Sequence, residues 1–131
     1  VCIAGAAADP VEIGLPAFMQ TFENACQRGA EPAQAATRAM QRAFLEYLCA
    51  LPDSHIVRKH GEALAHSVMT DARPWCERAR AGEALDSDPA FATWDETLKR
   101  RSINPGTSAD LSVATAMVAA WVQARGGFEP R

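Results

Sequence analysis

Residues 52–61, with the sequence PDSHIVRKHG, combine side chains whose types suit the binding of a polyphosphate. On a helix, His55, Arg58 and Lys59 share one face through their i, i+3 and i+4 spacing, and Asp53 stands just before the first turn. Arginine offers phosphate a flat fork of donors, lysine adds a mobile point charge, and a carboxylate can hold an accompanying magnesium ion. The segment therefore favours a phosphate and magnesium site. The alternative is a helix cap at Asp53 or Ser54 followed by a solvated charged face.

Residues 104–111, with the sequence NPGTSADL, form a polar turn that leads into an apolar helix. Thr107 and Asp110 have the spacing of a capping box, with Asp in place of the usual Glu, and an acid in the first turn suits the helix dipole. Capping alone accounts for both residues. The other interpretation is a ligand site at the helix start. There, Asp110 would repel bare phosphate, so a nucleotide would need magnesium beside Asp110 or a ribose facing it.

The remaining reactive side chains are predicted to be structural. His60 and His66 lack the H-E-x-x-H pattern of a zinc site, and a lone helical histidine is more often a packing or surface residue. No C-x-x-C spacing occurs, so the cysteines are predicted to be reduced core residues. They are Cys2, Cys26, Cys49 and Cys76. The three tryptophans are predicted to be packing anchors.

The elements that must position these motifs are predicted to be helices. Ala, Glu, Gln, Arg, Leu and Met fill the long segments, whereas Val and Ile do not alternate with polar residues. The sequence predicts an all-α fold, a single-domain bundle of five to six helices. The predicted helices cover residues 15–28, 32–48, 55–69, 71–82, 89–98 and 107–125. The last of them has no polar face beyond its first turn and is predicted to be central in the bundle.

Composition limits the function classes. The chain has 131 residues, of which 48% are hydrophobic, enough for one core. A formal net charge of -3 and a pI near 5.6 remove the general electrostatic case for binding nucleic acid or an anionic membrane. The longest apolar run is shorter than the roughly 20 residues that span a bilayer. A cytoplasmic protein with a small or proteinaceous partner is predicted, and a homo-oligomer stays open.

The two motifs, in this order, resemble the carboxy-terminal part of the triphosphoribosyl-dephospho-coenzyme A synthase family. The run NPGTSADL followed by an Ala-Thr helix is the more specific match, and PDSHIVRKHG is similar to the family's Asp-Ser/Thr segment that ends in basic residues and Gly. The resemblance covers most of the chain, from the first helix to Trp121. Arg58, Lys59 and His60 differ from the His-Arg pair of the citrate-lyase and malonate-decarboxylase branches, which indicates a divergent branch.

The resemblance implies an all-helical transferase for which ATP is the ribosyl donor. In this family the 2′-hydroxyl of a ribose of dephospho-coenzyme A displaces adenine from C1′ of ATP, and the product is a prosthetic-group precursor. Mg²⁺ is implied as the cofactor. By motif position, the implied nucleotide- and phosphate-binding residues are Asp53, His55, Arg58, Lys59, Thr107 and Ser108. The implied catalytic residues are Asn104 and Asp110, and the implied magnesium ligands are Asp53 and Asp110.

The family's amino-terminal half carries a further motif with Thr, His, Lys and Gly that residues 1–131 do not contain. The chain is therefore expected to be one all-α domain that forms the carboxy-terminal portion of a longer synthase. A non-catalytic helical module that binds a nucleotide or a partner protein stays an alternative, as does a related ribosyltransferase for another cofactor. In each case, His55, Arg58 or Lys59 is predicted to lie within side-chain reach of residues 104–110.

Overall fold

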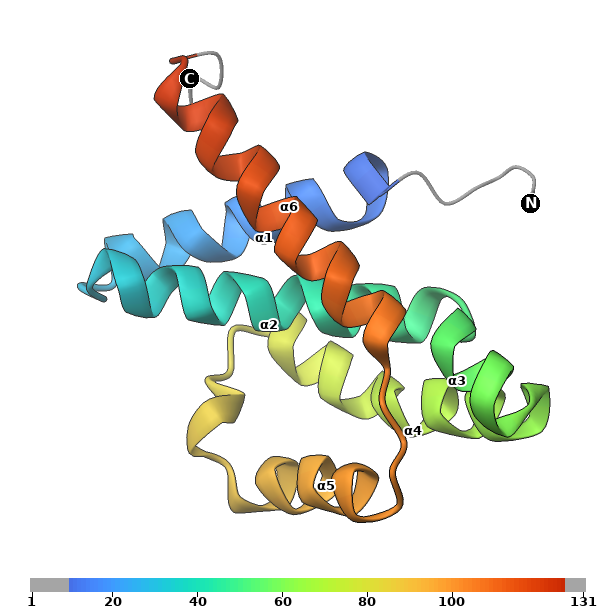
Figure 1. Cartoon of the computed structure of the whole chain (residues 1–131). Helices are drawn as coiled ribbons and strands as arrows, with labels where there is room; N and C mark the ends of the chain where they lie inside the picture. Colours follow the sequence, from blue (N-terminus) through green and yellow to red (C-terminus); the bar gives the residue numbers. More distant parts are fainter. Residues whose placement is uncertain (1–9, 127–131) are drawn as a thin grey trace.

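The computed structural model describes residues 10–126 and contains six α-helices and one short 3₁₀ helix, with no strand in that range (Figure 1). The elements are α1 (Pro10–Gln27), α2 (Pro32–Ala50), α3 (Ser54–His60), α4 (Glu62–Arg80), η1 (Leu85–Ser87), α5 (Pro89–Arg100) and α6 (Gly106–Ala124). The prediction of an all-α, single-domain fold with five to six helices is confirmed.

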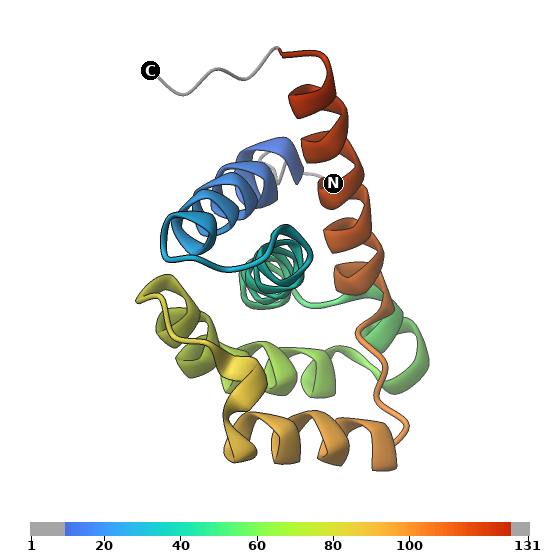
Figure 2. The same ribbon diagram turned by 90° about the vertical axis from the view of Figure 1, so that its left-hand side faces the viewer.

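The helices form a stack with one helix along its side. Figure 2 shows α1, α2, α4 and α5 stacked in that order, while α6 rises along one side of the stack from the α5 end towards α1. Helix α6 packs against both α1 and α2. The short helix α3 joins α2 to α4 and also contacts α6, so residues 52–61 lie where three long helices come together.

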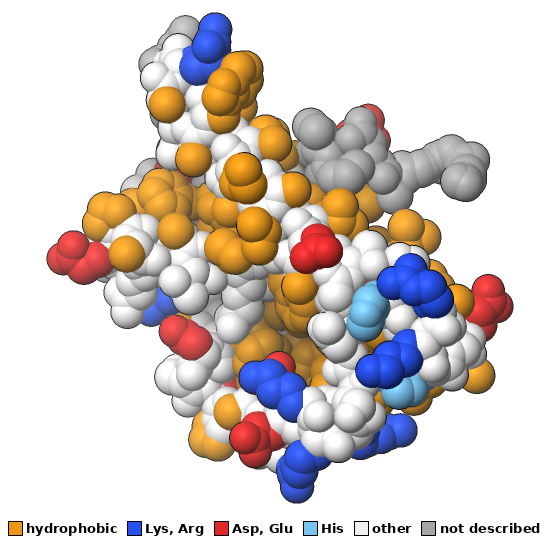
Figure 3. All heavy atoms as spheres, viewed as in Figure 1, with side chains coloured by type: hydrophobic (Ala, Val, Ile, Leu, Met, Phe, Trp, Pro, Cys, Tyr) orange, Lys and Arg blue, Asp and Glu red, His pale blue; other side chains and the backbone are white. Residues whose placement is uncertain are grey.

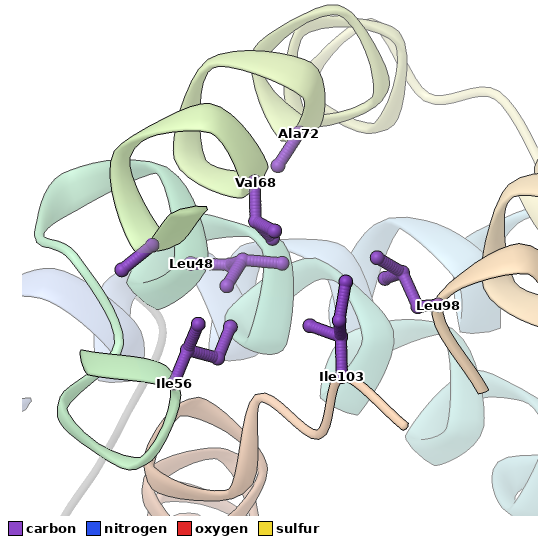
Figure 4. Close-up of a cluster of buried hydrophobic side chains, with 7 residues drawn as sticks. Leu48, Ile56, Val68, Ala72, Leu98 and Ile103 are labelled. Atoms are coloured by element: carbon purple, nitrogen blue, oxygen red, sulfur yellow. The ribbon is translucent and has the colours of Figure 1, made fainter. Parts of the chain in front are cut away.

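One core cluster fixes both polar motifs (Figure 4). Ile56 lies inside the first motif and is fully buried, and Ile103 lies immediately before the second and is 2% exposed. Both side chains belong to one cluster with Leu48 of α2, Val68 of α4 and Leu98 of α5. Burial of each large aliphatic side chain stabilises the fold by roughly 1.5 to 3 kcal/mol. The core therefore holds the first motif by Ile56 within it and the second motif by Ile103 immediately before it.

The structure corrects the predicted central position of the C-terminal helix. Its fully buried positions carry small residues, among them Ser112, Thr115 and Ala119, whereas most of its large apolar side chains face outwards. The exposed ones are Val113, Met117, Val118 and Trp121. The physical reason is close packing: small residues let α6 approach α2, and the Ser112 and Thr115 hydroxyls donate to Ala109 and Leu111 carbonyls of the same helix.

Tyr47 shows how closely these helices approach. Its hydroxyl oxygen lies 2.5 Å from the Thr115 Oγ1 atom of α6. Gly14 of α1 lies beside the Tyr47 side chain, and a Cβ atom at this position would come within 2.0 Å of the Tyr47 hydroxyl oxygen. Glycine is therefore required at position 14, since α1, α2 and α6 meet around one tyrosine.

The first helix begins at Pro10 and not at Leu15 as predicted, and the structure corrects two further boundaries. The helix predicted over residues 55–69 is divided at Gly61, whose φ of 97° lies in a region open to glycine alone. No new helix starts at residues 71–74, because α4 runs on through Pro74. Its buried stripe includes Ala72 and Cys76 on either side of the proline, and packing against α2 outweighs the lost hydrogen bond.

The cysteines are free thiols in the described range, as predicted, with Cys76 buried and Cys26 and Cys49 half-buried. Cys2 lies outside the described residues. Within residues 10–126, none of the helices combines the length and the apolar character that crossing a membrane requires.

Candidate functional site

Asp53 joins the two sequence motifs. Its carboxylate is 3% exposed and accepts four hydrogen bonds. The Oδ1 atom accepts from the backbone N–H groups of His55 at 2.9 Å and Ile56 at 3.2 Å, which caps α3 as predicted. The Oδ2 atom accepts from the backbone N–H of Ser108 at 2.7 Å and from its hydroxyl at 2.9 Å. One carboxylate therefore satisfies the N-termini of two helices that are distant in sequence.

Two further hydrogen bonds hold the motifs together. Ser54 Oγ lies 2.7 Å from Thr107 Oγ1, and His55 Nδ1 lies 2.9 Å from the backbone oxygen of Asn104. A carbonyl oxygen only accepts, so His55 Nδ1 is the donor, and in the neutral ring Nε2 is left as an acceptor. The prediction that His55 lies within reach of the second motif is confirmed.

Gly106 lies beside the imidazole ring of His55. A Cβ atom at this position would lie 3.4 Å from His55 Cγ and 3.6 Å from the Asn104 side-chain nitrogen, which are ordinary packing distances. The ring therefore rests against the start of α6, and there is room for a methyl group at position 106.

The predicted capping box at Thr107 and Asp110 was wrong. Helix α6 begins at Gly106, after Pro105, and has no side-chain cap from its own segment. The Thr107 hydroxyl contacts Ser54, and the capping role belongs to Asp53 in another part of the chain. Asp110 is exposed and makes no hydrogen bond or ion pair within residues 10–126. The Asp110 carboxylate is therefore available to a ligand.

The cations of the first motif are equally uncommitted. Arg58 and Lys59 lie in the last turn of α3, are exposed, and form no ion pair with any described residue. His60 differs, because its Nε2 donates to the carbonyl oxygen of Ser102 at 3.0 Å and braces a turn whose φ at Ser102 is 58°. His66 is exposed on α4, away from both motifs in sequence. Arg58 and Lys59 are thus the free positive charges of the first motif.

A cavity of about 440 Å³ opens beside the joined motifs. Lys59 and Asn104 line it on the motif side, while Phe44 of α2 and Phe91 and Trp94 of α5 form apolar walls. Figure 3 shows hydrophobic side chains in a hollow of the surface, with Lys and Arg side chains at its edges. The combination of apolar walls and a few polar groups is typical of a small-molecule site.

The aromatic walls were missed from the sequence. Phe91 and Trp94 have i, i+3 spacing on α5, and Trp75 of α4 packs on both, with ring centroids 5.3 Å from Phe91 and 6.2 Å from Trp94. This spacing predicts an apolar helix face, and the sequence interpretation was packing. The interpretation accounts for Trp75. Nothing in the local pattern shows that the other two also line a cavity.

The described residues do not fit a magnesium ion held by Asp53. Both of its oxygens are occupied by N–H and O–H donors, which a metal would have to displace. Within residues 10–126 no three Asp, Glu, His or Cys side chains lie together in a way that could hold a metal. Asp110 is the one predicted ligand whose carboxylate is exposed and unpaired within that range.

An all-helical fold in which two polar motifs meet beside an apolar cavity offers a suitable site for a small molecule. The family model of the ATP:dephospho-CoA triphosphoribosyl transferases (CitG) matches residues 4–127, nearly the whole chain, and the chain belongs to this family. The resemblance stated from the two motifs is confirmed. No curated protein and no solved structure matches the chain. At the level of the family, the function is transferase chemistry in cofactor biosynthesis with ATP as a substrate.

Proposed function

We propose that this protein transfers the triphosphoribosyl group of ATP to the 2′-hydroxyl of dephospho-coenzyme A. The bond between adenine N9 and C1′ breaks, a bond between the acceptor oxygen and C1′ forms, the hydroxyl proton is lost and adenine leaves protonated. The observation that supports this proposal is the junction at Asp53, which brings the free cations, an exposed acid and a cavity together. The family assignment supplies the reaction.

The triphosphate is assigned to Arg58 and Lys59. Neither side chain has an anionic partner within the described range, so both can offer charge-assisted hydrogen bonds to phosphate oxygens. Lys59 also lines the cavity, so it can direct the triphosphate towards the cavity mouth. Thr107, which is half-buried, adds a hydroxyl at the helix start. Ser108 gives both its N–H and its hydroxyl to Asp53, and we assign it and Asp53 to positioning the site.

The reacting ribose is assigned to the surroundings of Asn104 and Asp110. Cleavage at C1′ develops positive charge on the ribose, and the free carboxylate of Asp110 can stabilise it. The acceptor hydroxyl must lose a proton, and we assign its removal to His55 Nε2. Because Nδ1 donates to the Asn104 carbonyl oxygen, the ring is fixed in orientation and Nε2 of the neutral ring is the acceptor. The Asn104 side chain, which is exposed and lines the cavity, can orient a ribose hydroxyl. The aromatic walls offer adenine a stacking surface.

Magnesium enters this proposal as a partner of ATP. Asp110 is the protein carboxylate that could touch it, and no step is derived through the ion. The cytoplasmic location and the oligomeric state stay predictions from the sequence.

The test is the release of free adenine by purified protein given ATP, magnesium and dephospho-coenzyme A. Chromatography separates adenine from ADP and AMP, so ordinary ATP hydrolysis is distinguished from the transfer, and mass spectrometry detects the enlarged acceptor. Omission of the acceptor should abolish adenine release. Replacement by other ribose-containing nucleotides tests the related-ribosyltransferase alternative. ATP binding without adenine release for any acceptor would overturn the proposal in favour of a non-catalytic binding module.

A further inference from the structure

A second pocket, with a volume of about 110 Å³ and a polar lining, lies between α1, α2 and the end of α4. Four arginines line it, and we refer to them as the arginine pocket: Arg28 in the turn after α1, Arg38 and Arg42 of α2, and Arg80 of α4. It shares no lining residue with the cavity beside the motifs. Arg38 is separated from the end of α2, where the motifs begin, by roughly 18 Å of helix. The pocket is therefore distinct from the candidate active site.

The charges of the arginine pocket are only partly neutralised. Glu46 accepts from Arg42 Nε at 2.9 Å and from Arg80 Nε and Nη2, both at 2.8 Å. Glu83, the acid that lines the pocket, is held by Arg78 at 2.8 Å. These acids engage Arg42, Arg80 and Arg78. Arg28 and Arg38 have no ion pair with any residue in the range 10–126, although the chain as a whole is acidic.

Arg38 also has an unmet hydrogen bond. Its Nε atom is buried and has no acceptor among the described residues. Buried donors without an acceptor are uncommon in folded proteins because the group loses its bond to water. The neighbouring Gln20, Asn24 and Gln41 line the same pocket with neutral amides, which can donate but bring no compensating negative charge. Arg28 and Arg38 therefore offer guanidinium donors that no carboxylate of the described residues engages.

We propose that the arginine pocket binds one tetrahedral oxyanion, a phosphate group. Phosphate offers several acceptor oxygens to guanidinium forks, which accounts for arginines in preference to lysines. The volume suits one phosphate group and is too small for a whole nucleotide, which needs a pocket of about 300 Å³ or more. Free orthophosphate and the terminal phosphate of an ester share this chemistry. The proposal is independent of the transfer reaction, because the pocket shares no residue with the proposed active site.

Orthophosphate titration of the purified protein tests the proposal, with calorimetry and thermal melting as readouts. We expect saturable binding and a rise in melting temperature with phosphate concentration. The double variant Arg28→Gln/Arg38→Gln should weaken phosphate binding by at least about tenfold, because each lost charge-assisted bond is worth that much. Arg100→Gln, which removes an exposed arginine at the end of α5, is the matched control and should bind phosphate as the unmodified protein does.

Competition identifies the source of the phosphate group. An ester such as ATP or dephospho-coenzyme A that displaces orthophosphate from this pocket assigns the site to the ester, and failure to displace it assigns the site to free phosphate. Circular dichroism checks that the double variant is folded, and Arg38→Lys, which keeps the charge, should retain part of the affinity. Equal phosphate binding by the double variant and the unmodified protein, or the absence of saturable binding, would overturn the proposal.

Discussion

Two buried acids, Asp53 and Glu46, organise two regions of this molecule in opposite ways. Asp53 is 3% exposed and takes its hydrogen bonds from neutral N–H and O–H donors at two helix starts. Glu46 is 9% exposed and takes its hydrogen bonds from the guanidinium groups of Arg42 and Arg80. Asp53 positions its site without forming an ion pair with any of the nearby cations, so Arg58 is available to a ligand. Glu46 holds two of the four cations in place around a pocket.

The largest effect is expected at Asp53. The substitution Asp53→Ala leaves the N–H groups of His55, Ile56 and Ser108 without their acceptor in a buried place, so we expect a loss of about 3 kcal/mol in the free energy of unfolding. Urea denaturation measures it. Adenine release should also fall, because the two motifs lose their link.

Asp110→Ala is the matched control, since this acid belongs to the same junction but is exposed and unpaired within the described residues. Its free energy of unfolding should change by less than about 0.5 kcal/mol. If Asp53→Ala were as stable as this control, the junction would not depend on the carboxylate, and the contrast with Glu46 would lose its basis.

The next largest effect is expected on turnover at Asp110. Asp110→Asn keeps the shape of the side chain and removes its charge, and adenine release should fall by about two decades, as for a lost acid-base group. Stability should stay within about 0.5 kcal/mol, because the structure shows no capping bond from this residue. Adenine release at the unmodified rate would remove Asp110 from the catalytic residues and leave the junction with a binding role alone.

The meeting of the two motifs was predicted from the sequence better than the helix ends were. The cap at Asp53 follows from local chemistry, and the pairing of the motifs follows from two polar helix starts in an apolar bundle. The partner of Asp53 could not be predicted, because Ser108 lies in a helix that comes close through the packing of Ile56 and Ile103. The capping box was wrong for the same reason. Asp53, which is distant in sequence, accepts the hydrogen bond at the start of α6 that the prediction had assigned to Thr107.

The position of α6 and the course of α4 were mispredicted because packing decided them. A helix with apolar residues on every side gives no hint that its small residues, such as Thr115, are the buried ones. Likewise, Pro74 in the sequence indicates a helix start. In the structure the helix is continuous through Pro74, because Ala72 and Cys76 are buried on the same helix. The arginine pocket could not be predicted from a local pattern either, since its arginines come from α2, from α4 and from the turn after α1.

A smaller effect is expected at Arg58, on the Asp53 side of the comparison. Arg58→Ala should weaken ATP binding by about one to two decades, the worth of one charge-assisted hydrogen bond. Its stability should change by less than about 1 kcal/mol because the side chain is exposed. Calorimetric titration with ATP measures the first and a thermal melt the second. Arg100→Ala serves as the control, and the same ATP affinity in both variants would exclude Arg58 from the triphosphate site.

The smallest effect is expected at Glu46 and depends on pH. Burial alone would raise the pKa of Glu46, but the hydrogen bonds from Arg80 and Arg42 outweigh burial, and the pKa lies below its ordinary value of 4.5. A pKa lowered by folding stabilises the protein fully above the unfolded value, and this contribution is lost as the pH falls through the folded value. Glu46→Gln removes the charge while nearly keeping the volume. At pH 7 the variant should be less stable by about 1 kcal/mol, a modest value because Arg80 is half-exposed.

At a pH well below 4.5 the difference between Glu46→Gln and the unmodified protein should shrink, because the stabilisation by the ionised carboxylate is lost as the pH falls through the lowered pKa of Glu46. Urea denaturation at the two pH values measures this, with Glu77→Gln as the control because Glu77 is exposed on α4. Adenine release at pH 7 should be the same in both variants, as the chemistry is assigned to the Asp53 junction. A stability loss of equal size at both pH values would show that Glu46 acts through packing and not through its charge. The two acids would then differ less than their partners suggest.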